Sequence, residues 1–304
     1  LRRHGYTPRF AVGVVAGSAG VGMLIPPSLL LILFGLLAEQ SIGDLFVAGI
    51  GPGLLLAFLF GIGTILMAYL MPGVVGQNLG QVEEVLSGWD MLSKGLPISG
   101  LIALVLGGLY AGLFTPVEAG AVGTFAALLI SFARKTLTPQ GLWKILVETG
   151  LVTASICFLI IAAQMYSRML AFSGLPNSFG ALVAGAELGL LGLMCLYVLV
   201  VIVFGMILDS SSIMLILVPL MLPIVQPMDV DLVWFGIVTV LAVEIGLLTP
   251  PFGISVYVIK STLDDPSISL SDIFLGAAPF ALMMLVCPAI VIVFPEIATG
   301  LLSR

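Results

Sequence analysis

The stretch Gly22-Met23-Leu24-Ile25-Pro26-Pro27-Ser28 decides the fold of this chain, because it recurs as Gly246-Leu247-Leu248-Thr249-Pro250-Pro251-Phe252. Both stretches lie inside long apolar runs. A second match follows each double proline, Ser41-Ile42-Gly43-Asp44-Leu45-Phe46 against Ser269-Leu270-Ser271-Asp272-Ile273-Phe274, and leads into another long apolar segment. Two matches in the same order indicate an internal repeat, which has to be recognised before single motifs are interpreted.

The composition places the chain in a membrane. Of its 304 residues, 60% are hydrophobic and 9% are charged, and the mean hydropathy is +1.27, whereas a soluble domain is about 25% charged. The apolar runs are continuous rather than alternating, which excludes membrane barrel strands. We therefore expect an all-α polytopic membrane protein. Several runs reach the length of a bilayer-spanning helix. They are residues 45–71, residues 98–114, residues 119–132 together with the residues on either side of this run, and residues 273–294.

Other features of the composition exclude several classes of function. The net charge of −6 is spread over the loops, so we expect no nucleic-acid binding. Cys157, Cys195 and Cys287 lie far apart in apolar segments, which argues against a disulfide framework or a metal cluster and suggests small buried hydrophobes. His4 is the only histidine, and no Gly-x-x-x-x-Gly-Lys loop occurs, so neither a histidine-rich metal site nor an ATP-driven pump is expected.

Charges beside the two copies of the repeat predict that the copies enter the membrane from opposite faces. Arg2, Arg3 and Arg9 precede the first double proline, whereas Asp229 and Asp231 precede the second. Lysine and arginine favour the cytoplasmic side of a membrane. We therefore expect inverted structural repeats, with the first copy running outward and the second running inward.

We expect the chain to have three parts. Residues 1–72 form the end of the first inverted repeat, with a broken helix and a scaffold helix, and residues 73–96 form a polar cytoplasmic connector. Within the connector, residues 82–92 fit a helix that lies on the membrane surface, the alternative being a regulatory role. Residues 97–304 form the second repeat. Its expected elements are scaffold helices, a helical hairpin at about 182–225, a broken helix at 231–262 and a last helix at 272–294.

Both double prolines are expected to break their helices in mid-membrane, because proline lacks an amide hydrogen and disfavours helix in the residue before it. Carbonyls that lose their usual partners must line protein or a watery cavity, where a desolvated cation can bind. Paired discontinuous helices in an inverted repeat indicate a transporter's midplane site, the alternative being two structural kinks. The expected orphan carbonyls are those of Gly22, Met23, Gly246 and Leu247.

Small and hydroxyl residues around the breaks fit such a site. Glycines let another backbone approach closely, and hydroxyl oxygens suit a hard cation such as sodium. The glycines are Gly17, Gly20, Gly22, Gly246 and Gly253, and the hydroxyls are those of Ser18, Ser28 and Thr249.

The stretch Gly205-Met206-Ile207-Leu208-Asp209-Ser210-Ser211-Ser212 places an acid and three hydroxyls between two apolar limbs. An intramembrane acid suggests function by default. The alternative is that Asp209 caps the second limb through its first amides, and both roles are compatible. For four further acids the sequence leaves three roles open: pairing within the structure, a position at the membrane interface, or substrate binding. These acids are Glu118, Glu148, Glu187 and Glu244.

Over essentially its whole length, the chain resembles the large membrane subunit of tripartite ATP-independent periplasmic (TRAP) transporters. The order and spacing of several motifs carry this resemblance, rather than any single one. The motifs are Arg2-Arg3-His4-Gly5-Tyr6-Thr7-Pro8, Leu24-Ile25-Pro26-Pro27-Ser28, Ser41-Ile42-Gly43-Asp44-Leu45-Phe46, Gly108-Leu109-Tyr110-Ala111-Gly112-Leu113-Phe114-Thr115-Pro116-Val117-Glu118-Ala119, Gly205-Met206-Ile207-Leu208-Asp209, Trp234-Phe235-Gly236 and Glu244-Ile245-Gly246-Leu247-Leu248-Thr249-Pro250-Pro251-Phe252-Gly253.

The resemblance implies an elevator-type fold like that of the ion transporter superfamily, in which a transport domain moves against a scaffold, driven by sodium. It implies a permease that imports small organic anions such as C4-dicarboxylates or sugar acids, delivered by an extracytoplasmic binding protein. A small membrane subunit would complete the scaffold in the bacterial or archaeal cytoplasmic (inner) membrane. The chain opens Leu1-Arg2-Arg3-His4 without an initiator methionine or a signal peptide, where the family's first hairpin would be ending. We therefore expect an N-terminally truncated chain.

The resemblance also implies which residues bind sodium, because the family's sodium sites form where hairpin tips meet broken helices. The implied residues of the second repeat are Gly205, Asp209, Ser210, Ser212, Gly246, Leu247, Thr249, Pro250 and Gly253. Those of the first repeat, a partial site, are Ser18, Gly22, Met23, Ile25, Pro26 and Ser28.

Two other classes of function are the alternatives. A membrane-embedded enzyme could use the intramembrane acids, but it would need a second reactive partner, and no Gly-x-Gly-Asp, paired-Asp or nucleophile motif occurs. A channel could also use these acids, but inverted broken helices with hairpins suit alternating access better than an open pore. We therefore expect a transporter and not an enzyme, with sodium as coupling ion and no other cofactor or metal.

Overall fold

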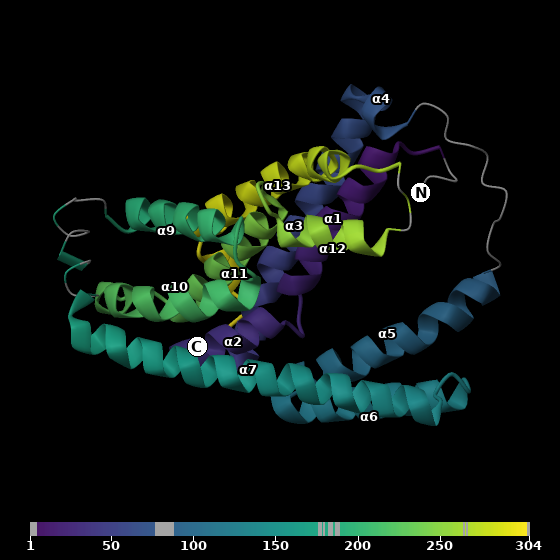
Figure 1. Ribbon diagram of the computed structural model, residues 1–304, viewed down its shortest axis with the longest axis horizontal. Coiled ribbons are helices and arrows are strands. Elements are labelled where there is room, and N and C mark those ends of the chain that lie inside the picture. The colour runs from purple at the N-terminus through teal and green to yellow at the C-terminus, as the bar shows by residue number, and fades with distance from the viewer. Residues whose placement is uncertain are drawn as a thin grey trace. The chain divides into compact units, whose positions relative to one another are not determined.

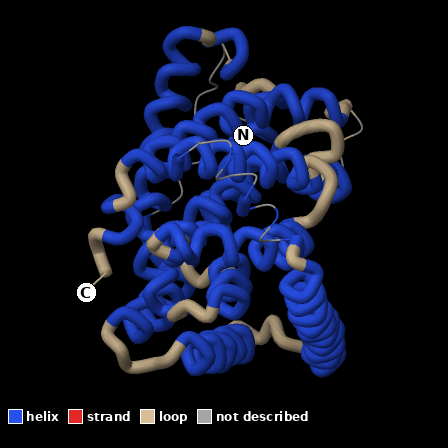
Figure 2. The backbone as a smooth tube through the Cα atoms, turned by 90° about the vertical axis from the view of Figure 1, so that its left-hand side faces the viewer, coloured by secondary structure: helices blue, strands red, loops and turns tan. Residues whose placement is uncertain are grey.

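Figure 1 shows the computed structural model of the chain, which describes residues 5–76, 88–175, 178, 180–181, 185, 189–263, 265 and 267–302. Within these ranges the chain is helix, turn or loop, without a strand (Figure 2). In these described ranges, five helices are long and apolar enough to cross a bilayer, or six spans if α1 (Pro8–Leu24) and α2 (Leu29–Ala38) count as one bent span. The prediction of an all-α polytopic membrane protein is therefore confirmed.

The remaining elements follow in chain order. α3 (Ile42–Leu70) and α4 (Pro72–Val75) complete the first part of the chain. The others are α5 (Gly88–Tyr110), α6 (Pro116–Ala133), α7 (Pro139–Ser173), α9 (Gly189–Gly205), α10 (Ser210–Val225), the short 3-10 helix η2 (Gln226–Met228), α11 (Leu232–Leu248), α12 (Ile254–Thr262), α13 (Leu270–Val293) and α14 (Glu296–Thr299).

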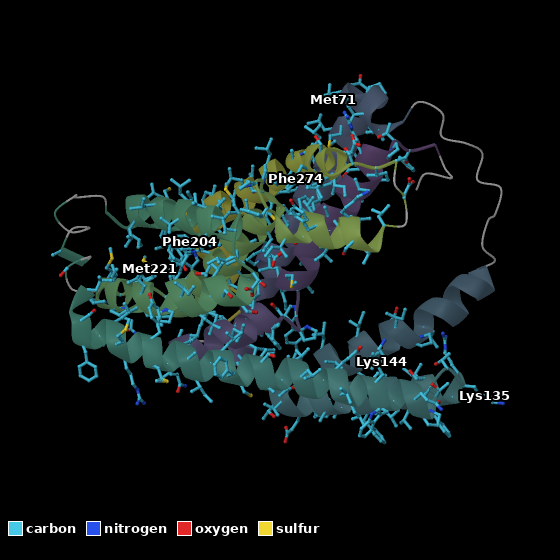
Figure 3. The ribbon with its side chains drawn as sticks, viewed as in Figure 1. Met71, Lys135, Lys144, Phe204, Met221 and Phe274 are labelled. Atoms are coloured by element: carbon cyan, nitrogen blue, oxygen red, sulfur yellow. The ribbon has the colours of Figure 1, made fainter. Side chains whose placement is uncertain are left out.

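The helices group into two compact units. The core unit comprises Leu1–Gln81 and Ser167–Arg304, and the second unit comprises Val82–Tyr166. In the second unit, α5 packs on α6. α6 begins with a capping box, in which Thr115 and Glu118 each accept a hydrogen bond from the other's backbone amide. Lys135 and Lys144 lie towards the same end of α6 and α7 (Figure 3).

The core unit is built around α11. Every side chain from Val233 to Leu248 is buried, and a helix that is apolar on all sides belongs in an interior. α1, α2, α3, α9, α10, α12, α13 and α14 all contact it. Trp234 anchors its first turn by donating an indole hydrogen bond to the Val291 carbonyl of α13 at 2.8 Å.

Two pairs of helices in the core unit follow the sequence repeat: α1 and α11 begin and end at corresponding residues, and α3 and α13 begin at corresponding residues. α1 and α11 are both 17 residues long and end at Leu24 and Leu248, just before the double prolines. Both Pro-Pro peptide bonds are cis. Ser41 and Ser269 cap α3 and α13, each accepting the amide hydrogen of the aspartate three residues later. α1 packs on α13, and α11 packs on α3.

The structure bears on two further expectations from the sequence, the burial of the cysteines and the surface helix at 82–92. Cys287 is buried as expected, but Cys157 and Cys195 are exposed, so the expectation of three buried cysteines was wrong. They lie on α7 and α9, where apolar side chains that face outward can contact lipid. Of the proposed surface helix at 82–92, residues 82–87 lie outside the described residues, and residues 88–92 begin α5.

Candidate functional site

The first double proline separates α1 from α2, and the two helices meet at a bend of 40°. Ser28 caps α2, because its hydroxyl oxygen accepts the Leu31 amide hydrogen at 3.4 Å. The same hydroxyl donates a hydrogen bond to the Met23 carbonyl. The Ser28 side chain therefore closes the break from the α2 side, and it is 2% exposed.

The second double proline separates α11 from α12. The Thr249 amide donates to the Gly246 carbonyl at 3.0 Å, and the Thr249 hydroxyl donates to the Ile245 carbonyl at 2.6 Å. With its hydrogen used in this way, the hydroxyl oxygen keeps its lone pairs for a further ligand. Gly253 ends the break with a φ of 52°, a left-handed conformation that glycine adopts without strain.

Not all of the expected orphan carbonyls are free. The Met23 carbonyl accepts from Ser28 and the Gly246 carbonyl accepts from Thr249, so the expectation for these two was wrong. The sequence argument counted only the amide four residues ahead and missed these shorter-range donors. Among the described residues, the carbonyls of Gly22 and Leu247 accept no hydrogen bond. The residue four ahead of Gly22 is Pro26 and the residue four ahead of Leu247 is Pro251, and neither has an amide hydrogen.

The turn between α9 and α10 meets the second break. The Met206 carbonyl accepts the amide hydrogens of Phe252 at 3.2 Å and Gly253 at 3.3 Å. Beside it, the backbones of α9 and α11 touch, since a Cβ atom on Gly205 would lie 2.7 Å from the Gly246 Cα atom. Gly205 and Gly246 are 41 residues apart in the sequence, yet their backbones are in contact.

Phe274 of α13 covers the far end of this break. A Cβ atom on Gly253 would lie 2.7 Å from the Phe274 ring, so only glycine fits beneath it. Figure 3 labels Phe274, together with Phe204 near the end of α9. The break is thus held by backbone hydrogen bonds to one neighbour and by ring packing against another.

Asp209 is the N-cap of α10. Its Oδ2 atom accepts the amide hydrogens of Ser211 at 3.0 Å and Ser212 at 3.1 Å, and its Oδ1 atom accepts the Ser212 hydroxyl hydrogen at 2.5 Å. The capping interpretation of Asp209 is therefore confirmed. The carboxylate is exposed, so its remaining lone pairs are open.

The other candidate residues lie in different settings. Ser18 is exposed on α1, and its hydroxyl donates to the Val15 carbonyl at 3.1 Å within the same helix. Ser210 opens α10 beside the Asp209 cap. Ile25 is half-buried and donates its amide hydrogen to the Val21 carbonyl at 3.0 Å, and Pro26 is buried.

The acids left open by the sequence separate clearly. Glu118 belongs to the capping box of α6, and Glu148 is exposed with Lys144 at 3.7 Å. Glu187 lies outside the described residues. Glu244 is 3% exposed on α11, with no hydrogen-bond partner for its Oε1 atom in the described part of the chain.

The oxygen atoms at the second break are suitable ligands for a hard, monovalent cation. The groups of the break with open lone pairs are two neutral oxygens, the Leu247 carbonyl and the Thr249 hydroxyl, and the turn that contacts the break adds the Asp209 carboxylate, three residues after Met206. In the described ranges, no group of three or more His, Cys, Asp or Glu side chains forms a metal cluster. Such a donor set fits sodium better than a transition metal, which prefers nitrogen and sulfur ligands.

Sequence reasoning missed the role of Met206, whose carbonyl connects the turn to the break. Its signal was the pair Gly205 and Gly246, each of which lacks a side chain where the other's backbone passes. A glycine in each of two apolar helices indicates that backbones meet, but not which ones.

Known proteins of one kind are similar to this chain over nearly its whole length. Residues 1–297 match the family model described as "Tripartite ATP-independent periplasmic transporter, DctM component". The chain is 32% identical to the C4-dicarboxylate TRAP transporter large permease protein of Pseudomonas aeruginosa, over 98% of this chain and 69% of the relative. It is 30% identical to the ectoine TRAP transporter large permease protein of Halomonas elongata, over 98% and 68%. It is 31% identical to the sialic acid TRAP transporter large permease protein of Vibrio cholerae, over 97% and 68%.

Proposed function

Because the chain belongs to the DctM component family of tripartite ATP-independent periplasmic transporters, we propose that it couples sodium entry to the import of small organic anions. The family makes it a large permease of the inner membrane, a multi-pass transport protein and not an enzyme. A tripartite transporter implies two further components, a small permease and a periplasmic binding protein.

Sodium coupling rests on one observation above the others, the contact between the α9–α10 turn and the second break. The Met206 carbonyl receives two amides of the break, and the Asp209 cap, the Leu247 carbonyl and the Thr249 hydroxyl all lie within six residues of these contacts along the chain. The proposed ligands of this site are Gly205, Asp209, Ser210, Ser212, Gly246, Leu247, Thr249, Pro250 and Gly253. The first break, with Ser18, Gly22, Met23, Ile25, Pro26 and Ser28, provides part of a second site.

Inverted repeats and an elevator mechanism are the finer part of the proposal. Equal lengths of α1 and α11 and matching serine caps on α3 and α13 support a repeat relation between the two copies. α9 and α10, joined by four residues, form the proposed hairpin. At a rise of about 1.5 Å per residue, α9 is about 25 Å long, shorter than the roughly 30 Å hydrocarbon core, whereas α10 continues through η2 as a helical stretch of 19 residues.

An elevator mechanism needs a moving transport domain and a fixed scaffold, and we propose which elements form each. The core unit holds both breaks and the α9–α10 turn, so we assign these elements to the moving transport domain, and α3 with the helices of the unit Val82–Tyr166 to the scaffold. The three-part organisation with boundaries at 72 and 96, the connector between them and the second repeat after it, belongs to the same proposal.

The substrate class follows the relatives. Their names give C4-dicarboxylate, sialic acid and 2,3-diketo-L-gulonate, all of which are organic anions, as well as ectoine. We propose that this chain imports a compound of this kind, delivered by the periplasmic binding protein. The small permease completes the scaffold.

Reconstitution tests the proposal. The assembled transporter in liposomes should take up a labelled C4-dicarboxylate or sialic acid when an inward sodium gradient and the loaded binding protein are both present. Replacing external sodium with potassium or choline at equal ionic strength is the control for the ion, and an unrelated binding protein is the control for delivery. Uptake that persists without sodium would contradict the coupling, and uptake without the binding protein would contradict the delivery.

A further inference from the structure

Glu244 is an ionisable side chain in the interior of the core unit without a partner among the described residues. It lies on α11, is 3% exposed, and its Oε1 atom has no hydrogen bond among the described residues. Burial of an ionised carboxylate without a compensating partner is among the most costly arrangements in a protein. In a membrane segment, such an acid points to a function by default.

The carboxylate faces the other broken helix. Its Oε2 atom lies 3.7 Å from the position that a Cβ atom would take on Gly20 of α1. Gly20 and Glu244 each lie four residues before the last residue of their helix, Leu24 and Leu248. They are therefore equivalent positions of the two repeat copies, and they face each other, as residues near a two-fold axis do. The atom closest to that Cβ position is the end of the Met284 side chain of α13, so the acid, Gly20 and Met284 lie together.

No basic side chain of the described residues neutralises Glu244. Arg9 pairs with Asp272 at 2.6 Å, and Lys260 donates to the Ile268 carbonyl at 2.6 Å. The ionisable residues on the helices that contact α11 are Arg9, Asp44, Tyr69, Cys195, Tyr197, Tyr257, Lys260, Asp272, Cys287 and Glu296. None of them forms a hydrogen bond or an ion pair with Glu244 in the described part of the chain.

An open carbonyl lies on the same side of α11 as the acid. Leu247 is three residues beyond Glu244, so the two share a face of the helix. The Leu247 carbonyl lacks an amide donor because Pro251 stands four residues ahead. A carboxylate with a backbone carbonyl is the ligand chemistry of hard cations.

We infer that Glu244 is the anionic ligand of a monovalent cation held between α1 and α11, at the crossing of the two broken helices. The inference rests on the proposed sodium coupling and adds a site that lies between the two breaks rather than at a hairpin tip. One carboxylate balances one monovalent charge, whereas a divalent ion would keep an excess positive charge in an apolar core. Bound there, the cation ties the two repeat copies together.

The test measures sodium binding directly rather than transport. The melting temperature of the purified, assembled transporter is recorded against sodium chloride concentration, with choline chloride keeping the ionic strength constant. A ligand that binds only the folded state raises this temperature as its concentration exceeds its dissociation constant. Glu244→Gln, which keeps the shape and removes the charge, should raise the sodium concentration for half-maximal stabilisation at least about tenfold. Glu148→Gln, at an exposed acid, should match the parent.

Each outcome decides the inference. If Glu244→Gln keeps the parent's sodium titration, Glu244 is an uncharged structural residue and the inference is wrong. If Glu244→Gln does not assemble, Glu244→Asp decides, because it keeps the charge and shortens the side chain by one methylene, which withdraws the carboxylate from α1. An unchanged sodium titration in Glu244→Asp would then overturn the site. A parent protein without any sodium-specific stabilisation would contradict the proposed sodium coupling itself.

Discussion

Replacing Gly246 by alanine should separate α9 from α11 at the candidate sodium site. A Cβ atom at this position would lie 2.6 Å from the Gly205 Cα atom and 2.9 Å from the Ile202 carbonyl oxygen. Carbon atoms in favourable contact are about 3.5–4.0 Å apart, so the two backbones must move apart by about 1 Å. Both obstacles are backbone atoms, and a rotamer change cannot relieve them. Overpacking of this kind costs about 1–3 kcal/mol.

The assay is the melting temperature of the purified transporter, recorded at one scan rate in the presence and absence of sodium. A loss of 1 kcal/mol corresponds to roughly 2–4 °C in a chain of about this size, so Gly246→Ala should melt several degrees below the parent. Gly61→Ala is the matched control, because Gly61 lies inside α3 with no heavy atom within 4 Å of its Cβ position. Alanine in a helix interior is favoured over glycine, so this control should equal or exceed the parent.

The same substitution should weaken sodium binding, because the Met206 carbonyl sits on the turn directly after Gly205. Moving α9 stretches its two hydrogen bonds to Phe252 and Gly253, now 3.2 and 3.3 Å. The sodium concentration for half-maximal stabilisation should therefore rise in Gly246→Ala and stay constant in Gly61→Ala. Equal melting temperatures and equal sodium titrations in the two variants would refute the close approach of α9 and α11.

Three further predictions concern the same site and the topology. Asp209→Asn should retain more sodium-driven uptake than Asp209→Ala at matched expression, since asparagine caps α10 and alanine forfeits about 1 kcal/mol; equal loss in both would show that the charge is required. Thr249→Ala should raise the sodium concentration for half-maximal uptake by roughly tenfold if the lost oxygen contributes about 1.4 kcal/mol, while Thr249→Ser should stay close to the parent. An unchanged sodium dependence in Thr249→Ala would make this break only a kink. In a cysteine-free background, an impermeant thiol reagent applied outside should label Asp229→Cys and not Gly5→Cys; labelling of both would overturn the inverted topology.

Local features of the sequence made the helices and their ends predictable. Proline acts on the residues next to it, so the ends of α1 at Leu24 and of α11 at Leu248 follow from the double prolines alone. The cap of α10 by Asp209 follows in the same way, because its acceptors and donors are within three residues. The resemblance to the large TRAP subunit is confirmed by the family match.

Contacts between distant segments were not predictable from one sequence. The Met206 carbonyl finds its donors at Phe252 and Gly253 only after α9 and α11 have packed. Glu244 stayed open for the same reason, since its neighbours Gly20 and Met284 come from α1 and α13. A residue's own spacing pattern contains no information on such partners.

The two breaks share a sequence pattern but are closed by different groups, and this difference matters for ion binding. In the first, the hydroxyl comes after the prolines, where Ser28 uses it on the Met23 carbonyl and on the Leu31 amide. In the second, the hydroxyl comes before the prolines, where Thr249 turns its hydrogen back to Ile245. The Ser28 oxygen uses one of its two lone pairs on an amide, whereas both lone pairs of the Thr249 oxygen stay open. We therefore expect the proposed site at the first break to bind sodium more weakly than the proposed site at the second.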